Sequence, residues 1–225
     1  MFKFNRKIKK NKGMTHSIRT QGHPEYSRGM TYVELIVVLS IFATMSSVVI
    51  FNYGDFQAKV DIKNLASDIA LKIVEAQKAS LSGKIPVQTP SVSPWKPSYG
   101  VYFDLSNSGS NKAFLYFVDL NQDGNYTDTS FCSLPGGSGE CLDKITIAKS
   151  VYISSINKCI GVNCASSVSI TDPLSVTFKR PDSRAIFKSN GVSMNDFDYV
   201  QITVSSPRSI IAKIKLYSSG RIQVN

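Results

Sequence analysis

One acidic residue stands at the edge of the longest strongly apolar run in this chain. The run covers residues 35–54 and carries no charge, and Glu34 directly precedes it. Twenty residues of α-helix span roughly 30 Å, which matches the hydrocarbon thickness of a bilayer. A carboxylate close to hydrocarbon is costly unless a cation pairs with it. The pattern therefore predicts a membrane-spanning helix with a charge-pairing group, Glu34, at its start.

A second group of polar residues has the spacing of metal ligands. Oxygen-bearing side chains alternate at Asp119, Asn121 and Asp123, and Gly124 follows them, as in the first half of a calcium-binding loop. The bidentate acid expected at the twelfth position is missing, because Ser130 stands there. The sequence therefore favours a turn between two strands, with side chains bonded to their own backbone. If calcium binds, its ligands are Asp119, Asn121, Asp123 and Asp128.

Four cysteines follow the apolar run: Cys132, Cys141, Cys159 and Cys164. An even number of cysteines in an exported domain suggests disulfides, and pairing between sequence neighbours is the simplest of the three connectivities. Zinc fits poorly, because the chain has no Cys-x-x-Cys and both histidines lie within the first 23 residues.

The same lack of histidine bears on catalysis. Residues 24–225 contain none, so they cannot form a Ser-His-Asp or Cys-His arrangement. No phosphate-binding loop or paired-glycine nucleotide motif occurs either. We predict that the protein is not an enzyme.

The net charge of +10 is concentrated at the N-terminus. Residues 1–29 hold eight Lys or Arg and one acid, and the rest of the chain holds 18 basic and 15 acidic residues. A basic segment before an apolar run keeps that end in the cytoplasm. Met14 is an alternative start to Met1, and neither start changes this prediction.

Beyond the apolar run the sequence predicts an amphipathic helix, a linker and a β domain. Apolar residues recur at helical spacing among charged ones over residues 55–83, with an end near Gly83. Four prolines make residues 84–98 an extended linker, which Trp95 is expected to anchor. Alternating apolar residues then predict seven or more antiparallel strands over residues 99–225 and an α+β architecture. The strands are expected at 99–105, 113–120, 145–147, 151–153, 174–178, 185–188, 200–204, 210–216 and 222–224.

The N-terminal pattern resembles a known processing signal. A basic leader that ends in Gly29, then Met30, Thr31 and Glu34 before an apolar helix, is similar to the class III signal of type IV pilins and type II secretion pseudopilins. The resemblance implies that a prepilin peptidase cleaves between Gly29 and Met30 and methylates Met30, where this family usually has Phe. It also implies that Glu34 pairs with the N-terminal amine of a neighbouring subunit. Thr31 and Glu34 equally fit a capping box, in which they satisfy the first amides of the helix.

The C-terminal half extends the resemblance. The segment 117–124 and a final hairpin that closes at Ser219 and Gly220 are similar to H-type minor pseudopilins and FimT-like minor pilins. The expected organisation is a removed leader (1–29), an assembly half (30–54) and an amphipathic half (55–83) of one helix, the linker (84–98) and the β domain (99–225).

The resemblance implies a structural subunit of a type IV pilus or a type II secretion pseudopilus. Its partners would be the prepilin peptidase, other pilins, the cytoplasmic membrane and the pilus assembly platform. The protein would cross the inner membrane once, with its N-terminus in the cytoplasm, before it enters the filament. One alternative is a plain single-pass anchored protein, which shares the helix but not the peptidase site.

The other alternative is a minor pilin that binds DNA during uptake. FimT-like DNA receptors carry a Gly-Arg-x-Arg element, of which Gly220 and Arg221 match the first half and Gln223 replaces the second arginine. Phosphate contacts would make such binding strongly dependent on salt. The basic residues that would contact DNA are Arg208, Lys213, Lys215 and Arg221.

Overall fold

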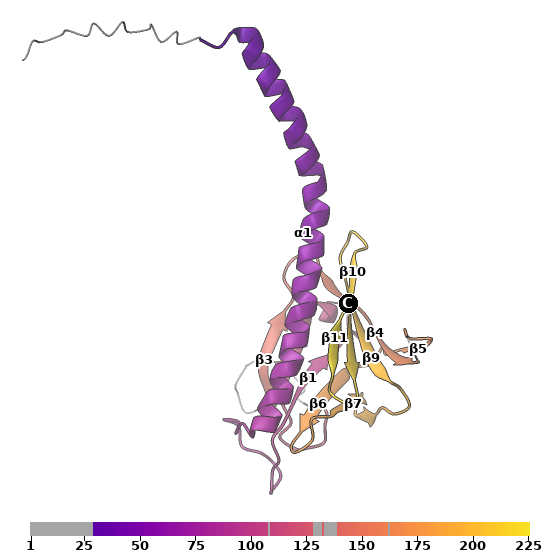
Figure 1. The fold of residues 1–225 in the computed structure, drawn as a ribbon. Helices are drawn as coiled ribbons and strands as arrows, with labels where there is room; N and C mark the ends of the chain where they lie inside the picture. Colours follow the sequence, from indigo (N-terminus) through magenta and orange to yellow (C-terminus); the bar gives the residue numbers. More distant parts are fainter. Residues whose placement is uncertain (1–28, 108, 128–131, 133–138, 162) are drawn as a thin grey trace, which may run out of the picture. The chain divides into compact units, whose positions relative to one another are not determined.

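The computed structural model describes residues 29–107, 109–127, 132, 139–161 and 163–225. It confirms the predicted α+β architecture, with one long helix followed by two antiparallel sheets (Figure 1). The chain divides into two units, Met1–Ser47 and Val48–Asn225. Both sheets belong to the second unit.

The helix α1 covers Tyr32–Ser82, a length of 51 residues. Its first turn is capped by Thr31, whose hydroxyl accepts the amide hydrogen of Glu34 at 3.3 Å. It ends where predicted, because Gly83 adopts a φ of 72° that most residues avoid. The amides of Gly83 and Lys84 bond back to the carbonyls of Ser80 and Ala79, which gives a glycine C-cap of the Schellman type.

Each of the two sheets joins two groups of consecutive strands. The strands are β1 (Ser98–Phe103), β2 (Ala113–Val118), β3 (Cys141–Thr146), β4 (Tyr152–Ile160), β5 (Ser166–Ser169), β6 (Leu174–Lys179), β7 (Ala185–Ser189), β8 (Val192–Ser193), β9 (Tyr199–Ser205), β10 (Ile211–Tyr217) and β11 (Ile222–Val224). A short 3₁₀ helix, η1 (Ser110–Lys112), precedes β2. One sheet has the order β3-β2-β1-β6-β7-β8 and the other β11-β10-β9-β4-β5, so the pairs β1–β6 and β9–β4 join strands that are far apart in the sequence.

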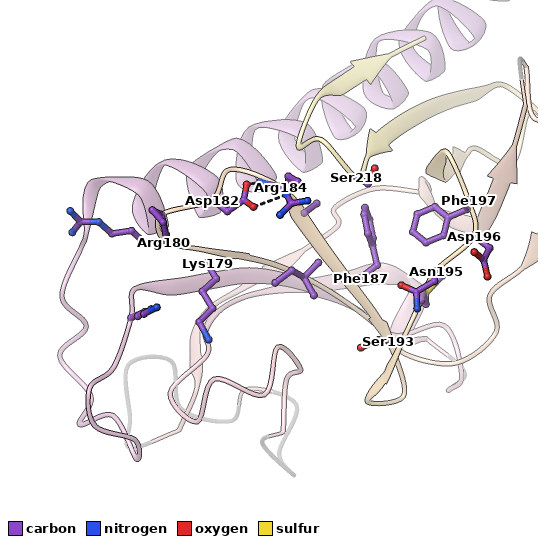
Figure 2. A pocket seen from close by; sticks show the side chains of 15 residues that line it. Lys179, Arg180, Asp182, Arg184, Phe187, Ser193, Asn195, Asp196, Phe197 and Ser218 are labelled. Carbon is purple, nitrogen blue, oxygen red and sulfur yellow. Dashed lines mark hydrogen bonds and ion pairs between the residues drawn. The ribbon is translucent and has the colours of Figure 1, made fainter.

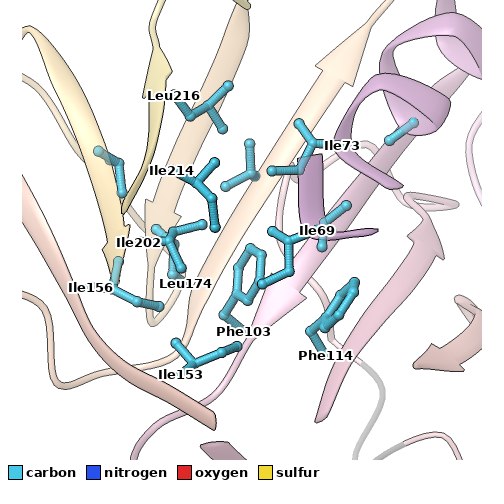
Figure 3. Close-up of a cluster of buried hydrophobic side chains, with 14 of the residues drawn as sticks. Ile69, Ile73, Phe103, Phe114, Ile153, Ile156, Leu174, Ile202, Ile214 and Leu216 are labelled. Carbon is cyan, nitrogen blue, oxygen red and sulfur yellow. The ribbon is translucent and has the colours of Figure 1, made fainter. Parts of the chain in front are cut away.

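One hydrophobic core joins residues 62–79 of α1 to both sheets. Ile69 and Ile73 are completely buried in one cluster with Phe103 and Phe114, whose rings stack with centroids 5.7 Å apart (Figure 3). Ile202 of β9 brings the second sheet into the same cluster. The helical spacing of these isoleucines places them on one face, so the amphipathic pattern of the sequence positions the helix on the sheets.

The structure corrects several strand predictions. Leu105 and Ile147 lie outside β1 and β3, and β3 begins earlier, at Cys141. The strand expected at 151–153 is the nine-residue β4, which continues through the polar residues Asn157 and Lys158. β5 was not predicted, because its serines show no apolar alternation.

Candidate functional site: the uncovered helix segment and the loop after β2

The first candidate site is the uncovered apolar segment, residues 30–53. Its large apolar side chains are between 45% exposed, at Leu35, and 80% exposed, at Phe51. By length and composition α1 is apolar enough here to cross a membrane. Side chains of this kind are stable only in lipid or against other protein.

Glu34 lies in the first turn of this segment. Its amide is held by the cap of Thr31, so half of the predicted capping box is present. Its exposed carboxylate takes part in no hydrogen bond or ion pair with any other residue that the structure describes. Gly29 and Met30 precede the helix, are exposed and belong to no helix or strand.

Two ion pairs lie at the start of the covered half of α1, by which we mean residues 54–82, after the uncovered segment. Arg208, in the turn between β9 and β10, pairs with Asp55. Lys149, in the turn between β3 and β4, pairs with Asp61. Each bond joins a sheet connection to the helix, close to the point at which the uncovered segment ends.

Both disulfides join sequence neighbours, as predicted. Cys132 is bonded to Cys141 at the start of β3, and Cys159 of β4 is bonded to Cys164. Cys132 and Cys141 belong to a small second cluster with Leu115, Phe117 and Tyr126. The first disulfide thus fixes the long connection between β2 and β3 to the sheet.

The second candidate site is the loop of residues 119–124, which directly follows β2. Asp119 Oδ2 accepts hydrogen bonds from the Ser98 hydroxyl at 3.1 Å and the Gly124 amide at 3.0 Å. Asn121 Oδ1 accepts the amide of Asp123 at 2.9 Å. Side chains bonded to their own backbone are what the turn prediction expected. The turn does not by itself join two strands, however, because β2 and β3 are connected through residues 119–140.

Two carboxylates at this loop are buried. Burial raises the pKa of Asp119, and the hydrogen bonds from Ser98 and Gly124 act in the opposite direction. Burial likewise raises the pKa of Glu140, and the neighbouring charge of Asp119 adds to that rise. Glu140 was not singled out in the sequence, where the only signal was its position next to Cys141. Asp128, the fourth predicted calcium ligand, lies outside the described residues.

The linker is anchored to the same loop, as expected for Trp95. Its indole N–H donates to the carbonyl of Asp119 at 2.9 Å. The amide of Ser91 donates to the carbonyl of Leu120 at 3.2 Å. Among the residues placed by the structure, no three His, Cys, Asp or Glu side chains are grouped so that they could hold a metal.

The four basic residues of the DNA alternative do not form one surface. Arg208 is engaged by Asp55. Lys213 and Lys215 share one face of β10, and the Lys215 ammonium lies 4.9 Å from the ring centre of Tyr199. Arg221 stacks over Tyr217 at 4.0 Å. Three of the four therefore lie on one side of the final hairpin.

A cleft of about 600 Å³ lies beside β7, between residues 179–187 and 193–197 (Figure 2). Phe187 and Phe197 meet edge to face at its apolar end. Arg184 is paired with Asp182, whereas Lys179 and Arg180 point in different directions. The basic side chains do not converge on a common point, so this arrangement does not define a site for one anion.

Comparison with known proteins finds two relatives. A stretch of 99 residues is 30% identical to a fimbrial protein of Pseudomonas aeruginosa, covering 43% of this chain and 62% of that protein. A second fimbrial protein of the same organism is 29% identical over the same length. The chain thus spans less than two thirds of the length of either relative. No protein-family model and no solved structure matches the chain. The fold and these two similarities support a pilin-type family.

Proposed function

We propose that the protein is a structural subunit of a type IV pilus or a type II secretion pseudopilus. The observation that carries this proposal is the uncovered apolar segment, which begins with Glu34, a carboxylate that is paired with none of the described residues. Similarity to two fimbrial proteins supports a role in a filament of pilin subunits. In this role the protein acts by assembly, and no catalytic activity is required.

The uncovered apolar segment would be shielded from water in two successive environments, first the lipid bilayer and then the filament. Before assembly it crosses the cytoplasmic membrane once, with the N-terminus in the cytoplasm and the two sheets on the outer side. During assembly it moves from lipid into the filament, where the apolar segments of many subunits pack together. Since lipid and protein are equally apolar, packing and polar pairing must drive this step.

Glu34 supplies the polar pairing. In the proposed order of events, a prepilin peptidase cuts after Gly29 and methylates Met30, which creates a cationic chain end. That end pairs with Glu34 of a neighbouring subunit and sets the axial position of each new subunit as the assembly platform adds it. An unpaired carboxylate at the edge of hydrocarbon is costly, so the wrong position is disfavoured.

Within this class we propose a minor subunit of the H-type or FimT-like kind. The support is the motif at 117–124 and the final hairpin of β10 and β11. A DNA-binding role would use Lys213, Lys215 and Arg221 on that hairpin. A gel-shift series with the protein at low and moderate salt separates the two roles, because phosphate contacts must weaken as salt rises. Absence of binding at low salt would eliminate the DNA role.

The assembly role is tested by Glu34→Ala in cells that contain the filament machinery. We expect normal membrane insertion and leader removal, and at least a tenfold loss of the protein from sheared filaments. Asp68→Ala is the matched control, since it removes an exposed acid from the covered half of the same helix. Incorporation of Glu34→Ala at the level of Asp68→Ala would show that Glu34 has no part in assembly.

A further inference from the structure

Asp119 carries a buried oxygen that lacks a partner. The residue is 1% exposed, and its Oδ1 takes part in no hydrogen bond within the part of the chain that the structure describes. The other oxygen, Oδ2, accepts the Ser98 hydroxyl at 3.1 Å and the Gly124 amide at 3.0 Å, so the carboxyl group lies between β1 and the turn that ends the 119–124 loop. A buried carboxylate oxygen without a donor is strongly unfavourable. Oδ1 is therefore a position that calls for a donor or a cation.

A second buried carboxylate lies beside the same loop. Glu140 is 6% exposed, and its two oxygens accept the amides of Leu120 and Thr127 at 3.2 and 3.0 Å. Neither Glu140 nor Asp119 has an ion pair with any Lys or Arg whose position is described. The ammonium group of Lys188 donates instead to the backbone carbonyl of Asp123. Two buried carboxylates thus share one region, and the nearby Lys188 ammonium is bonded to a backbone carbonyl and not to either of them.

The other oxygen side chains of the loop keep acceptor capacity. Asn121 Oδ1 accepts one amide hydrogen, from Asp123. The Asp123 carboxylate accepts the amide of Asn125 at 2.7 Å and the side-chain amide of Asn121 at 2.9 Å. A carboxylate offers about four acceptor positions, so two remain at Asp123. Gly124, at a φ of 75°, makes the sharp turn that brings the loop back.

We propose that the 119–124 loop binds one calcium ion through Asp119 Oδ1, with Asn121 and Asp123 as further side-chain ligands. Calcium takes six to eight oxygen ligands and accepts neutral amide and backbone carbonyl oxygens as well as carboxylates. A site with two loop carboxylates and neutral oxygens therefore fits calcium. The ion would also offset the charge of Glu140, which lies beyond the proposed ligands.

The loop is connected to the one tryptophan of the chain, which makes the site observable. The indole of Trp95 bonds to the carbonyl of Asp119 itself. Gln122 of the loop also donates to the carbonyl of Lys96 at 3.1 Å. An ion at Asp119 should therefore alter the surroundings of Trp95.

The experiment is a calcium titration of the purified full chain in detergent, after chelation of bound cations. We expect a saturable change in Trp95 fluorescence below about 1 mM calcium, the range of extracellular sites, and little response to magnesium. At saturation the melting temperature should rise by about 5–10 °C. No fluorescence change and no melting shift up to about 10 mM calcium would overturn the proposal.

Two variants locate the ion. Asp119→Asn should abolish the melting shift, and Asp123→Asn, at a partly exposed position, should weaken calcium binding at least tenfold. Asp104→Asn is the matched control. It also removes a buried loop carboxylate, but one whose two oxygens are bonded to Ser106 and Asn107. Asp104→Asn should keep the full calcium response. If Asp119→Asn does not fold, an unchanged calcium affinity in Asp123→Asn would by itself contradict the proposed ligand set.

Discussion

The two halves of α1 share one backbone and have opposite surroundings. In the covered half, Ile69 and Ile73 are completely buried against two sheets. In the uncovered segment, Ile41 is 50% exposed and Phe51 is 80% exposed. The sequences differ accordingly, because charged residues recur among the apolar ones in the covered half, whereas Glu34 is the one charged residue of the uncovered segment. A helix with apolar residues on one face suits a single domain in water, and a helix that is apolar on all sides requires lipid or other subunits.

This difference separates folding from assembly within one element. The covered half belongs to the core that stabilises the Val48–Asn225 unit. The uncovered segment contributes little to that core, so its sequence is free to meet the needs of the proposed membrane and filament roles. The distinction can be tested by substitutions that act on one half and spare the other.

The largest expected effect is that of Ile73→Ala in the covered half. Removing a completely buried side chain should lower the free energy of unfolding by about 2–5 kcal/mol, from lost burial and the cavity left behind. The measurement is urea unfolding of the full chain in mild detergent, followed by Trp95 fluorescence.

Ile41→Ala is the paired control in the uncovered segment. It should change the unfolding free energy by no more than about 0.5 kcal/mol, because Ile41 is not part of the core. Equal destabilisation by the two variants would show that the division of the helix into two functions is wrong.

The next effect concerns the sheet that covers the helix. Replacing both Cys132 and Cys141 by serine releases a disulfide with a sequence separation of 9. The unfolding free energy should fall by about 2–3 kcal/mol on the chain-entropy model. Membrane integration, measured by alkaline extraction, should remain unchanged, since it depends on the uncovered segment alone. Release of the variant into the soluble fraction would contradict this separation.

A smaller effect than that of the buried isoleucine or the disulfide is expected at the start of the covered half. Arg208→Ala removes the ion pair with Asp55, in which both side chains are more than half exposed. Exposed pairs contribute about 0–1 kcal/mol. Arg208→Ala should therefore lower the unfolding free energy by less than Ile73→Ala does. The same denaturation assay measures it. A loss above about 2 kcal/mol would mean that this pair, rather than the core, fixes the helix to the sheets.

The sequence predicted the parts of the fold that depend on local pattern. The helix end at Gly83 and the final hairpin follow from glycine positions and apolar spacing. The two-sheet arrangement does not, because alternation specifies which face of a strand is buried and not which strand lies beside it. The pairing of β1 with β6 joins residues more than 70 positions apart. β5 was missed because a strand held by its neighbour β4 needs no apolar residues of its own.

The candidate sites were predictable to different degrees. The cap of Glu34 by Thr31 and both disulfides follow from residue type and short spacing. The approach of Glu140 to the 119–124 loop does not, because it depends on how residues 119–140 connect β2 to β3. The ion pair between Arg208 and Asp55 could not be predicted from the sequence either, because 153 positions separate the two residues.

Mass spectrometry of the mature N-terminus tests the central claim most directly. The protein would be purified from the membranes of cells with an active prepilin peptidase. The assembly role predicts a chain that begins at N-methylated Met30. A chain that still carries its basic leader would contradict that role and leave a membrane-anchored α+β domain.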